Sequence, residues 1–405
     1  MKRRVILIFL GSLIIVFTAI LSCYFINNKS SNISSNRNNT MNNKNSFENS
    51  FINNLDYDKN ENILVSPLSL AYALSMVKEG ASGNTLKEIE NTLNNYKLSF
   101  MQSIPNVISI TNSIFIKDNF NSLVNSVYIN TLGINYRAQV YYDSFNAVDN
   151  INNYVKDKTF NMIPNFLSND DITEETLLLL INALAINLKW ENEFDCNQTT
   201  KSIFYLNDGN TMDTYMMHSN EKYIENDDVY GFIKDYATYD ENGNVSDNGN
   251  TFELIALLPK NNLNDVLSKI SNKYIVELEE TSSENIDISF PRFSYEYKIP
   301  NLVNTLNKMG INDLFTDKAD LSKISDDLYV SNAIQKTFID LNESGTKASA
   351  STGIILDNYS AVEENHDLIF NKPFIYIIKE KHEDNIWFIG VVNSPTEYEE
   401  NKSIC

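Results

Sequence analysis

The sequence predicts one large domain of the α+β class. Helix patterns come first along the chain, mixed elements follow, and short apolar strands dominate the second half. This order favours helices packed against large sheets. About 350 residues follow a low-complexity stretch near the N-terminus without a second such break, so one domain is favoured over two.

The first 23 residues indicate export. Residues 2–4 are Lys-Arg-Arg and precede an uncharged, mostly apolar run over residues 5–20, the pattern of a signal peptide or membrane anchor. The run ends in Leu-Ser-Cys23, which resembles a bacterial lipobox, so we favour lipidation of Cys23. An uncleaved transmembrane anchor is the alternative, because the run is about long enough to span a bilayer. Both place the remaining chain on the extracellular face of a bacterial membrane, with release as a further possibility.

Residues 24–46 are mostly Asn, Ser and Lys. This composition buries too little apolar surface to offset the entropy of ordering, so we expect a flexible tether. The folded domain is then expected over residues 47–399.

Composition excludes several kinds of partner. The net charge is −21, and no basic cluster follows residue 4, so we expect no nucleic-acid partner. Apart from Cys23, the cysteines are Cys196 and Cys405, too few for a disulfide framework; whether either one pairs is left open. The three histidines lie far apart without ligand spacing, so we expect neither a metal site nor a cofactor.

Three helix starts are visible. Ser66-Pro67 suits an N-cap followed by the first helical position. A capping-box pattern over residues 85–88 predicts a second start at Thr85. Apolar residues from Ile299 to Met309 predict a third helix, which Gly310 closes as a C-terminal cap.

The strands are of two kinds. Residues 286–290 alternate apolar and polar side chains before Pro291, as in a half-buried strand. Residues 254–258, 374–378 and 387–392 are short continuous apolar runs, which suit strands covered on both faces. A longer run over residues 177–190 carries Asn182, whose buried amide needs hydrogen-bond partners and so predicts an internal polar cluster.

Several separated motifs carry a family resemblance. The N-terminal half contains Asn-Ile-Leu-Val-Ser-Pro-Leu-Ser over residues 62–69, Gly80-Ala81-x-Gly83-x-Thr85, Asn152-x-Tyr154-Val155, and Asn182-Ala183 through Lys189-Trp190 to Phe194. The C-terminal half contains Phe290-Pro291-Arg292-Phe293, Leu306-x-x-Met309-Gly310, Phe370-Asn371-Lys372-Pro373-Phe374 and a closing stretch from Gly390 to Pro395. In this order they resemble the serpin family of serine protease inhibitors. The resemblance implies a large central mixed β-sheet, further sheets, eight or nine helices and an exposed reactive-centre loop over about residues 343–367.

Two departures from the family pattern bear on regulation. The stretch from Thr85 to Asn112 is shorter than in most members, at a place where some carry a heparin-binding helix, so with the acidic charge we do not expect heparin binding. The family's usual histidine in the sheet-centre polar cluster is Gln335 here. Glutamine still donates and accepts with Ser66, Ser69 and Asn182, but it does not titrate near neutral pH.

The loop begins with a hinge of small side chains, which comprises Glu343, Gly345, Thr346, Ala348, Ser349, Ala350 and Ser351. Composition alone favours a flexible linker here. The resemblance reverses this interpretation, because a loop that slips between two strands after cleavage needs small side chains wherever it turns inward.

The family's usual spacing after Gly345 places the reactive bond between Tyr359 and Ser360. A shift of one residue in either direction stays open, and so does the interpretation of Tyr359 as exposed filler. An aromatic residue there suits chymotrypsin-like or subtilisin-like serine proteases, and a cysteine protease is the alternative.

Family topology also brings Arg292 beside Glu343, at the point where the loop enters the sheet, called the breach. We expect a salt bridge there that delays premature insertion, with Trp190 packed nearby. If partly exposed, this pair contributes only about 0.5 kcal/mol.

The function expected from the resemblance is that of an extracellular, irreversible serine protease inhibitor that acts as a monomer. It traps the protease by suicide cleavage, a covalent acyl-enzyme and loop insertion. A non-inhibitory binding module of the same fold is the first alternative. A hydrolase has little support, because no histidine has a plausible partner nearby, so we expect no enzyme and no catalytic residues.

Overall fold

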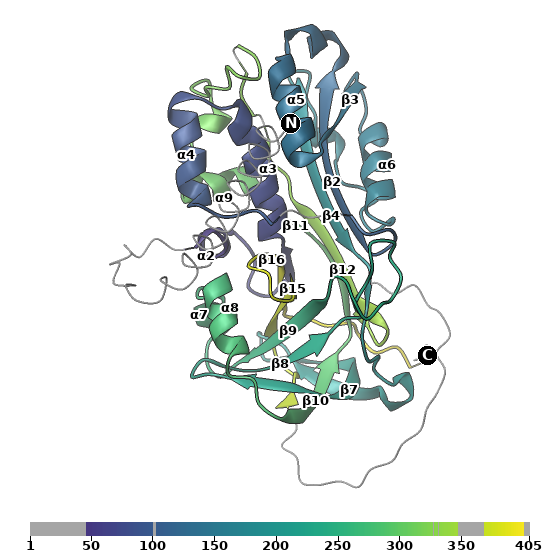
Figure 1. Ribbon diagram of the computed structural model, residues 1–405. Helices are drawn as coiled ribbons and strands as arrows, with labels where there is room; N and C mark the ends of the chain where they lie inside the picture. Colours follow the sequence, from purple (N-terminus) through teal and green to yellow (C-terminus); the bar gives the residue numbers. More distant parts are fainter. Residues whose placement is uncertain (1–45, 100–102, 327, 331, 347–367, 401–405) are drawn as a thin grey trace, which may run out of the picture. The chain divides into compact units, whose positions relative to one another are not determined.

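The computed structural model describes residues 46–99, 103–326, 328–330, 332–346 and 368–400 (Figure 1). These residues belong to one unit of the chain, which begins at residue 45. The expected signal segment with Cys23, almost all of the expected tether, and Cys405 lie outside them. So do the loop residues Ala348, Ser349, Ala350, Ser351, Tyr359 and Ser360. Within the described part, no helix is both long and apolar enough to cross a bilayer.

Eight α-helices lie in the described residues, in agreement with the eight or nine expected. They are α2 (Phe47–Asn53), α3 (Pro67–Gly80), α4 (Gly83–Leu93), α5 (Ser126–Tyr136), α6 (Asp149–Lys158), α7 (Leu263–Leu267), α8 (Asn272–Glu279) and α9 (Leu302–Met309). Short 3-10 turns are η1 (Asp118–Leu123), η2 (Asn169–Asp171), η3 (Cys196–Gln198) and η4 (Asp313–Phe315).

The helix starts agree with the sequence prediction in one case of three. Ser66 caps α3, with its hydroxyl accepting from the Ser69 amide and Pro67 at the first helical position. The capping box at Thr85 is wrong: α4 begins at Gly83, and the buried Thr85 hydroxyl instead accepts a hydrogen bond from the Asp320 amide at 2.9 Å. The local pattern predicted that this hydroxyl caps the helix, but it makes a tertiary hydrogen bond instead.

The third helix, α9, is shorter than predicted. Asn301 caps it, so Ile299 lies before the helix and not within it. Its predicted end is confirmed, because Gly310 closes the helix with a φ of 109°, a conformation that glycine adopts without strain.

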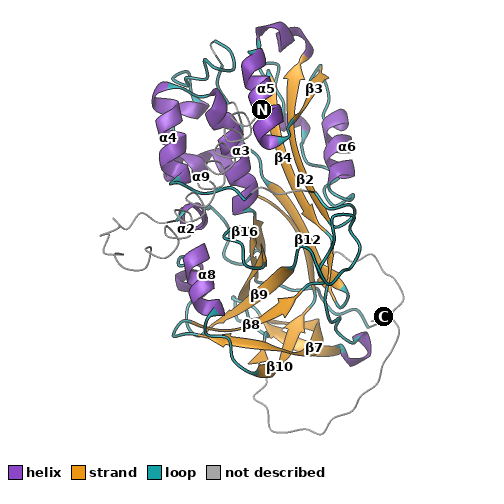
Figure 2. Cartoon of the chain, in the orientation of Figure 1, coloured by secondary structure: helices purple, strands orange, loops and turns teal. Residues whose placement is uncertain are grey.

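The strands of the described residues form three sheets, and Figure 2 shows how these strands lie relative to the helices. The largest has nine strands and is mixed, because β14 runs parallel to β10 while the other pairs are antiparallel. Its order is β1 (Ile63–Val65), β16 (Ile386–Val392), β15 (Phe374–Glu380), β9 (Phe252–Pro259), β8 (Val229–Asp235), β7 (Thr211–Glu225), β10 (Asn285–Pro291) and β14 (Leu368–Ile369), with β6 (Thr200–Tyr205) also on β7. The predicted apolar runs are confirmed as β9, β15 and β16, which are buried almost throughout.

Two smaller sheets complete the β-structure. One has the order β11 (Phe293–Lys298), β12 (Lys336–Asn342), β13 (Gly345–Thr346) and β5 (Leu188–Lys189). The other has the order β3 (Gln139–Asp143), β2 (Ile108–Lys117) and β4 (Leu178–Ile186). The predicted run over residues 177–190 is thus divided between two sheets, as β4 and β5.

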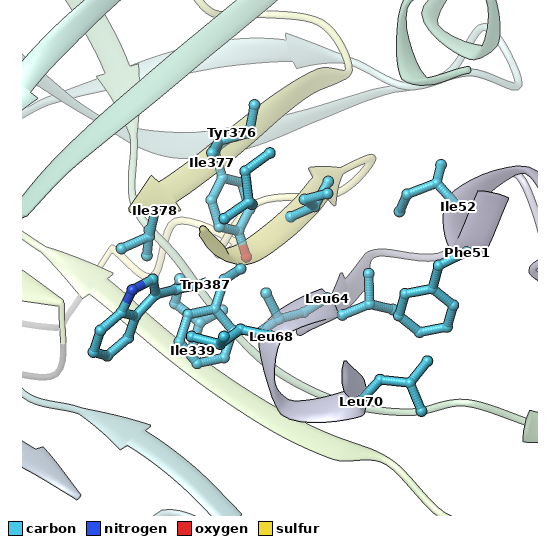
Figure 3. Packing of buried hydrophobic residues seen from close by; sticks show 14 of the residues in the cluster. Phe51, Ile52, Leu64, Leu68, Leu70, Ile339, Tyr376, Ile377, Ile378 and Trp387 are labelled. Carbon is cyan, nitrogen blue, oxygen red and sulfur yellow. The ribbon is translucent and has the colours of Figure 1, made fainter. Parts of the chain in front are cut away.

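One hydrophobic core joins the helices to these sheets. Figure 3 shows side chains that are far apart in sequence packed together: Phe51, Leu64, Leu68, Leu70, Ile339, Tyr376, Ile377, Ile378 and Trp387. A second core lies on the other face of β4, where Ile181, Ala183 and Ala185 pack against side chains of α6. Since successive side chains of a strand point to opposite faces, β4 lies between the two cores.

A buried charge cluster lies on the large sheet. Lys379 of β15 donates to Glu253 of β9 at 3.3 Å and to Glu279 of α8 at 3.1 Å. Burial raises the pKa of Glu253 to about 7, with a further increase from Glu279, while Lys379 opposes both. Asp235 of β8 adds a smaller increase.

We predict that this carboxyl makes stability depend on pH. Because its pKa in the folded chain lies above its usual value, its contribution is fully present below about pH 4.5 and is lost as the pH rises through about 7. Glu253→Gln should therefore reduce the fall in unfolding free energy between these pH values by up to about 3 kcal/mol. Urea unfolding across this pH range measures the change. Glu277→Gln, at an exposed ion pair, is the matched control, and equal slopes in the two variants would contradict the prediction.

Candidate functional site

A cleft separates β4 from β12. On one side β4 pairs with β2 along its whole length, and on the other β12 pairs with β11. Both strands are fully described, and no ladder joins them to each other. The cleft has a volume of about 140 Å³ and is lined mainly by apolar side chains of β4, α3 and residues 330–334. Along the cleft, the facing edges of these two strands are therefore not paired with each other in a ladder.

The described part of the hinge forms a short strand beside β12. After Asn342 the chain turns at Glu343 and Ser344, and β13 runs back antiparallel to β12, with Leu341 opposite Thr346. On its other edge β13 pairs antiparallel with β5, with Gly345 opposite Lys189. Gly345 and Thr346 of the hinge thus already lie between β12 and β5, which the sequence did not predict.

Gly345 and Thr346 are well matched to their positions in β13. Gly345 has a φ of 151°, and a Cβ there would lie 2.1 Å from the Leu188 carbonyl oxygen, so no larger residue fits this backbone. Thr346 is buried, and its hydroxyl lies 2.5 Å from the Tyr236 hydroxyl. A charged side chain at residue 346 would have to displace this contact.

The ion pair expected at the breach is present. Nη2 and Nε of Arg292 lie 2.5 and 2.7 Å from one carboxylate oxygen of Glu343, and Thr199 donates its hydroxyl to the same oxygen at 2.5 Å. The guanidinium also lies over the Tyr215 ring, 4.8 Å from its centre. The Glu343 side chain is 9% exposed and that of Arg292 16%, so the pair is largely buried, and the small contribution expected for the case of a partly exposed pair does not apply. Loss of one partner of a buried pair costs more, because the other charge stays buried and unpaired.

Trp190 packs at the same place. Its indole N–H donates to the Asn342 carbonyl at 2.9 Å, and its amide donates to the Ser344 carbonyl at 3.1 Å. The ring stacks on Tyr236, with 4.3 Å between ring centres. These bonds hold the turn between β12 and β13.

Sequence reasoning missed Lys234, which lies behind this turn. Its ammonium group is buried 4.3 Å from the centre of the Phe194 ring and forms an ion pair with Glu221. Burial lowers the pKa of Lys234, and Glu221 opposes this decrease. A lysine within the otherwise largely apolar strand β8 is the sequence feature that could have identified this buried charge. Tyr236 and Thr199 offered no such signal, because nothing in the local pattern distinguishes them.

The residues of the polar cluster line the cleft. Gln335, next to β12, accepts from the Ser66 amide and donates to the Ser66 carbonyl, both at 2.9 Å. The Ser66 hydroxyl accepts from the Ser69 amide at 3.1 Å, and the Ser69 hydroxyl donates to Asn182 of β4. The expected direct contacts of Gln335 with Ser69 and Asn182 are wrong, because its two amide ends are already bonded to the backbone.

Asn112 of β2 is a further member of the cluster that the sequence did not assign. Its side-chain carbonyl accepts from the Asn182 amide at 2.6 Å. The cluster therefore connects the two sides of the cleft through the first turn of α3.

Cys196 in η3 is half of a disulfide. Its partner cysteine is not among the described residues. The sequence left open whether Cys196 or Cys405 pairs, and the structure shows that Cys196 forms a disulfide.

Comparisons with known proteins agree on one family. A profile described as "Serpin (serine protease inhibitor)" matches residues 42–395. The chain is 30% identical over 362 residues to the leukocyte elastase inhibitor of Bos taurus, covering 82% of this chain and 93% of that protein. It is 30% identical over 372 residues to an uncharacterised serpin-like protein of Methanosarcina acetivorans, covering 85% and 84%. The crystal structure of the thermophilic serpin tengpin in its native state superposes with a TM-score of 0.74 at 29% identity, covering 86% of this chain and 92% of that one.

These findings correct the unqualified statement that the chain is no enzyme. They support the coarser statement that the matching family consists of protease inhibitors, whose members are typically not enzymes. They include mammalian and archaeal proteins, so they do not assign a bacterial source.

We predict that Arg292→Ala destabilises the uncut form by about 3–5 kcal/mol, because Glu343 is then left buried without its partner. The change should speed conversion to a heat-resistant, inserted form. The half-time of this conversion during incubation at elevated temperature is the measurement, with Lys201→Ala at an exposed pair as control. Equal half-times for Arg292→Ala and the unaltered chain would rule out a delaying role for the pair.

Proposed function

This chain is a member of the serpin family of serine protease inhibitors, and on that premise we propose that it is an extracellular, irreversible inhibitor. Its target protease cleaves the loop over residues 343–367, stays attached as an acyl-enzyme and is deformed when the loop inserts between β4 and β12.

One observation carries this proposal: β13 already lies between β12 and β5, antiparallel to both of its neighbours. If its register continues, Ala348 comes to lie opposite Ile339, and Ala350 opposite Thr337. Because side chains alternate along a strand, these alanines share the buried face of Thr346. Small side chains therefore fall where space is limited.

The free energy for deforming a protease comes from the strand edges. About ten inserted residues that gain ladder hydrogen bonds at ~1 kcal/mol net each supply on the order of 10 kcal/mol. An inserted segment of this length extends roughly 35 Å at ~3.3 Å per residue. The attached protease is carried that distance from the breach.

The covalent step is proposed at Tyr359. The serine hydroxyl of the protease attacks the Tyr359 carbonyl carbon, an ester bond forms, and the bond to the Ser360 nitrogen breaks as that nitrogen accepts a proton. The general base is the protease's own, so this chain supplies the acyl group and the free energy of insertion. Insertion then removes the ester from the geometry in which water could hydrolyse it.

The target proposed is a chymotrypsin-like or subtilisin-like serine protease, with a cysteine protease as the alternative. Support comes from the aromatic side chain of Tyr359, which suits a wide apolar pocket. We further propose that the chain acts as a monomer on the outer face of a bacterial membrane, held by lipidated Cys23 or by an uncleaved anchor. The basic and apolar pattern of residues 2–20 supports this location.

We predict that a panel of serine and cysteine proteases contains at least one that forms a complex stable on a denaturing gel. Sequencing of the released C-terminal peptide should give Ser360 as its first residue, or a residue one position away. Cleavage by every protease that attacks the loop, without a stable complex, would show a substrate or binding module instead of an inhibitor.

We predict that Thr346→Arg reduces stable complexes to less than about a tenth, because a buried guanidinium without a partner costs several kcal/mol. Loop cleavage should continue at an unchanged rate. Thr346→Ser keeps the hydroxyl that contacts Tyr236 and is the control. Undiminished complexes in Thr346→Arg would mean that insertion is not the mechanism.

A further inference from the structure

The disulfide of Cys196 has two candidate partners within the chain. Cys196 lies in η3, shortly before β6, and the chain contains two further cysteines, Cys23 and Cys405. The Cα atoms of two bonded cysteines lie about 4.4–6.8 Å apart. The partner is therefore the cysteine whose neighbouring chain is brought close to η3.

The C-terminal tail, residues 393–400, first follows β7. Its Thr396 amide donates to the Arg292 carbonyl at 3.0 Å, next to the end of β10. Its Tyr398 amide donates to the Asp213 carbonyl of β7 at 2.9 Å. The tail thus occupies the edge of β7 at the place where β10 has ended.

Beyond Tyr398 the tail crosses from β7 to β6. The Glu399 amide donates to the Tyr215 hydroxyl at 3.1 Å, and the Tyr398 ring lies against the Tyr215 ring with 4.8 Å between their centres. The Lys201 ammonium lies 5.4 Å from the centre of the Tyr398 ring. Lys201 belongs to β6 and is the register partner of Tyr215. The end of the tail therefore lies beside the strand that η3 precedes.

The chain between these places and the two cysteines is long enough to close the bond. At ~3.3 Å per residue, the segment from Tyr398 to Cys405 extends up to roughly 23 Å. By the same measure, Cys196 lies within roughly 17 Å of Lys201. The two cysteines therefore meet without any movement of β6 or β7.

Cys23 is the less favourable partner. It precedes residues 24–46, and the first helix after them, α2, packs against α3 and α9 (Figure 1). The effective concentration of a tethered thiol falls with the length of its tether, and the segment that leads to Cys405 is much shorter than the one that leads to Cys23. The geometry therefore favours Cys405, which leaves the Cys23 thiol available for the lipidation proposed above.

A bond between Cys196 and Cys405 joins the two pieces that loop cleavage creates. The proposed cut after Tyr359 divides the chain into residues 1–359 and residues 360–405. The second piece contains β15 and β16, which are buried and pair with β9 and β1. Apolar burial and strand ladders hold this piece while the protein is folded. These interactions end on unfolding, whereas a disulfide persists.

We propose that Cys196 and Cys405 form a disulfide that keeps residues 360–405 covalently attached after the protease has cut the loop. The inference rests on the proposed function for the place of the cut. Each thiol loses one hydrogen atom when the bond forms. An oxidised thiol oxidoreductase outside the cell accepts the two electrons and two protons, and its own disulfide becomes a dithiol. Exported proteins keep such bonds because their surroundings are oxidising.

The trapped complex gains a second covalent link from this bond. The ester joins the protease to residues 1–359, and the disulfide joins residues 360–405 to the same piece. If the nine-stranded sheet opens locally, β15 and β16 stay at high effective concentration and return to their places. The C-terminal peptide therefore leaves the complex only when the protein is both denatured and reduced.

The test is a denaturing gel of the full chain nicked near Tyr359, run with and without dithiothreitol after free thiols have been blocked with iodoacetamide. We expect residues 360–405 to stay attached without the reductant and to separate with it. Cys196→Ser and Cys405→Ser should each lose this peptide without the reductant. Cys23→Ser is the matched control and should behave like the unaltered chain.

A second measurement does not depend on how well the variants fold. Mass spectrometry of a non-reduced digest of the unaltered chain should show a peptide with Cys196 linked to a peptide with Cys405. A peptide that links Cys196 to Cys23 would overturn the inference. Release of residues 360–405 from the unaltered chain without dithiothreitol would also overturn it.

Failure of this inference and failure of the proposed function give different results on the same gel, because nicking needs no inhibition. A stable protease complex that loses residues 360–405 without the reductant refutes the disulfide and leaves the inhibitor. A nicked chain that keeps the peptide, with no stable complex for any protease, refutes the inhibitor and leaves the disulfide.

Discussion

The facing edges of β4 and β12 are the constraint on which the rest of the structure depends. Among the described residues, β4 forms a ladder with β2, and β12 forms one with β11 and a short one with β13 at its end, while an apolar cleft lies between β4 and β12. Backbone groups without ladder partners are a source of free energy, because ladder formation releases it as soon as a suitable strand arrives. The hinge residues Gly345 and Thr346 show which orientation that strand takes.

Three groups of polar contacts lie at or near this cleft. The ion pair of Arg292 and Glu343 holds the turn from which the loop departs. The polar cluster lines the cleft and joins its two sides through Ser66, which caps α3, and Ser69 in the first turn of α3. The segment over residues 159–177, which leads into β4, contacts β11 and β12 through the ion pair of Asp171 with Lys298 and the bond from Lys336 to the Asn165 carbonyl. Each group uses hydrogen-bonded polar atoms, so each resists separation of the strands only while its geometry is intact.

The titratable groups make the stability of the nine-stranded sheet depend on pH near neutrality, whereas the polar cluster at the cleft contains no such group. The polar cluster that lines the cleft contains amides and hydroxyls, which do not titrate near neutral pH. The carboxyl whose pKa burial raises to about 7, Glu253, belongs to the nine-stranded sheet. A change of pH around neutrality therefore acts on the stability of that sheet more than on the cleft itself.

The sequence alone determined what depends on local pattern. Alternation and continuous apolar runs located β9, β10, β15 and β16, Ser66 marked the start of α3, and separated motifs identified the family. Local pattern did not determine the hydrogen-bond partner of each polar group. The Thr85 hydroxyl accepts from the Asp320 amide, and the Gln335 side chain donates to the Ser66 carbonyl. The pairing of Gly345 and Thr346 with β5, the contact of Tyr236 with Thr346, and the contacts of residues 171 and 165 with Lys298 and Lys336 join residues more than a hundred positions apart. Such pairings are set by the packing of whole sheets, so only the tertiary structure decided them.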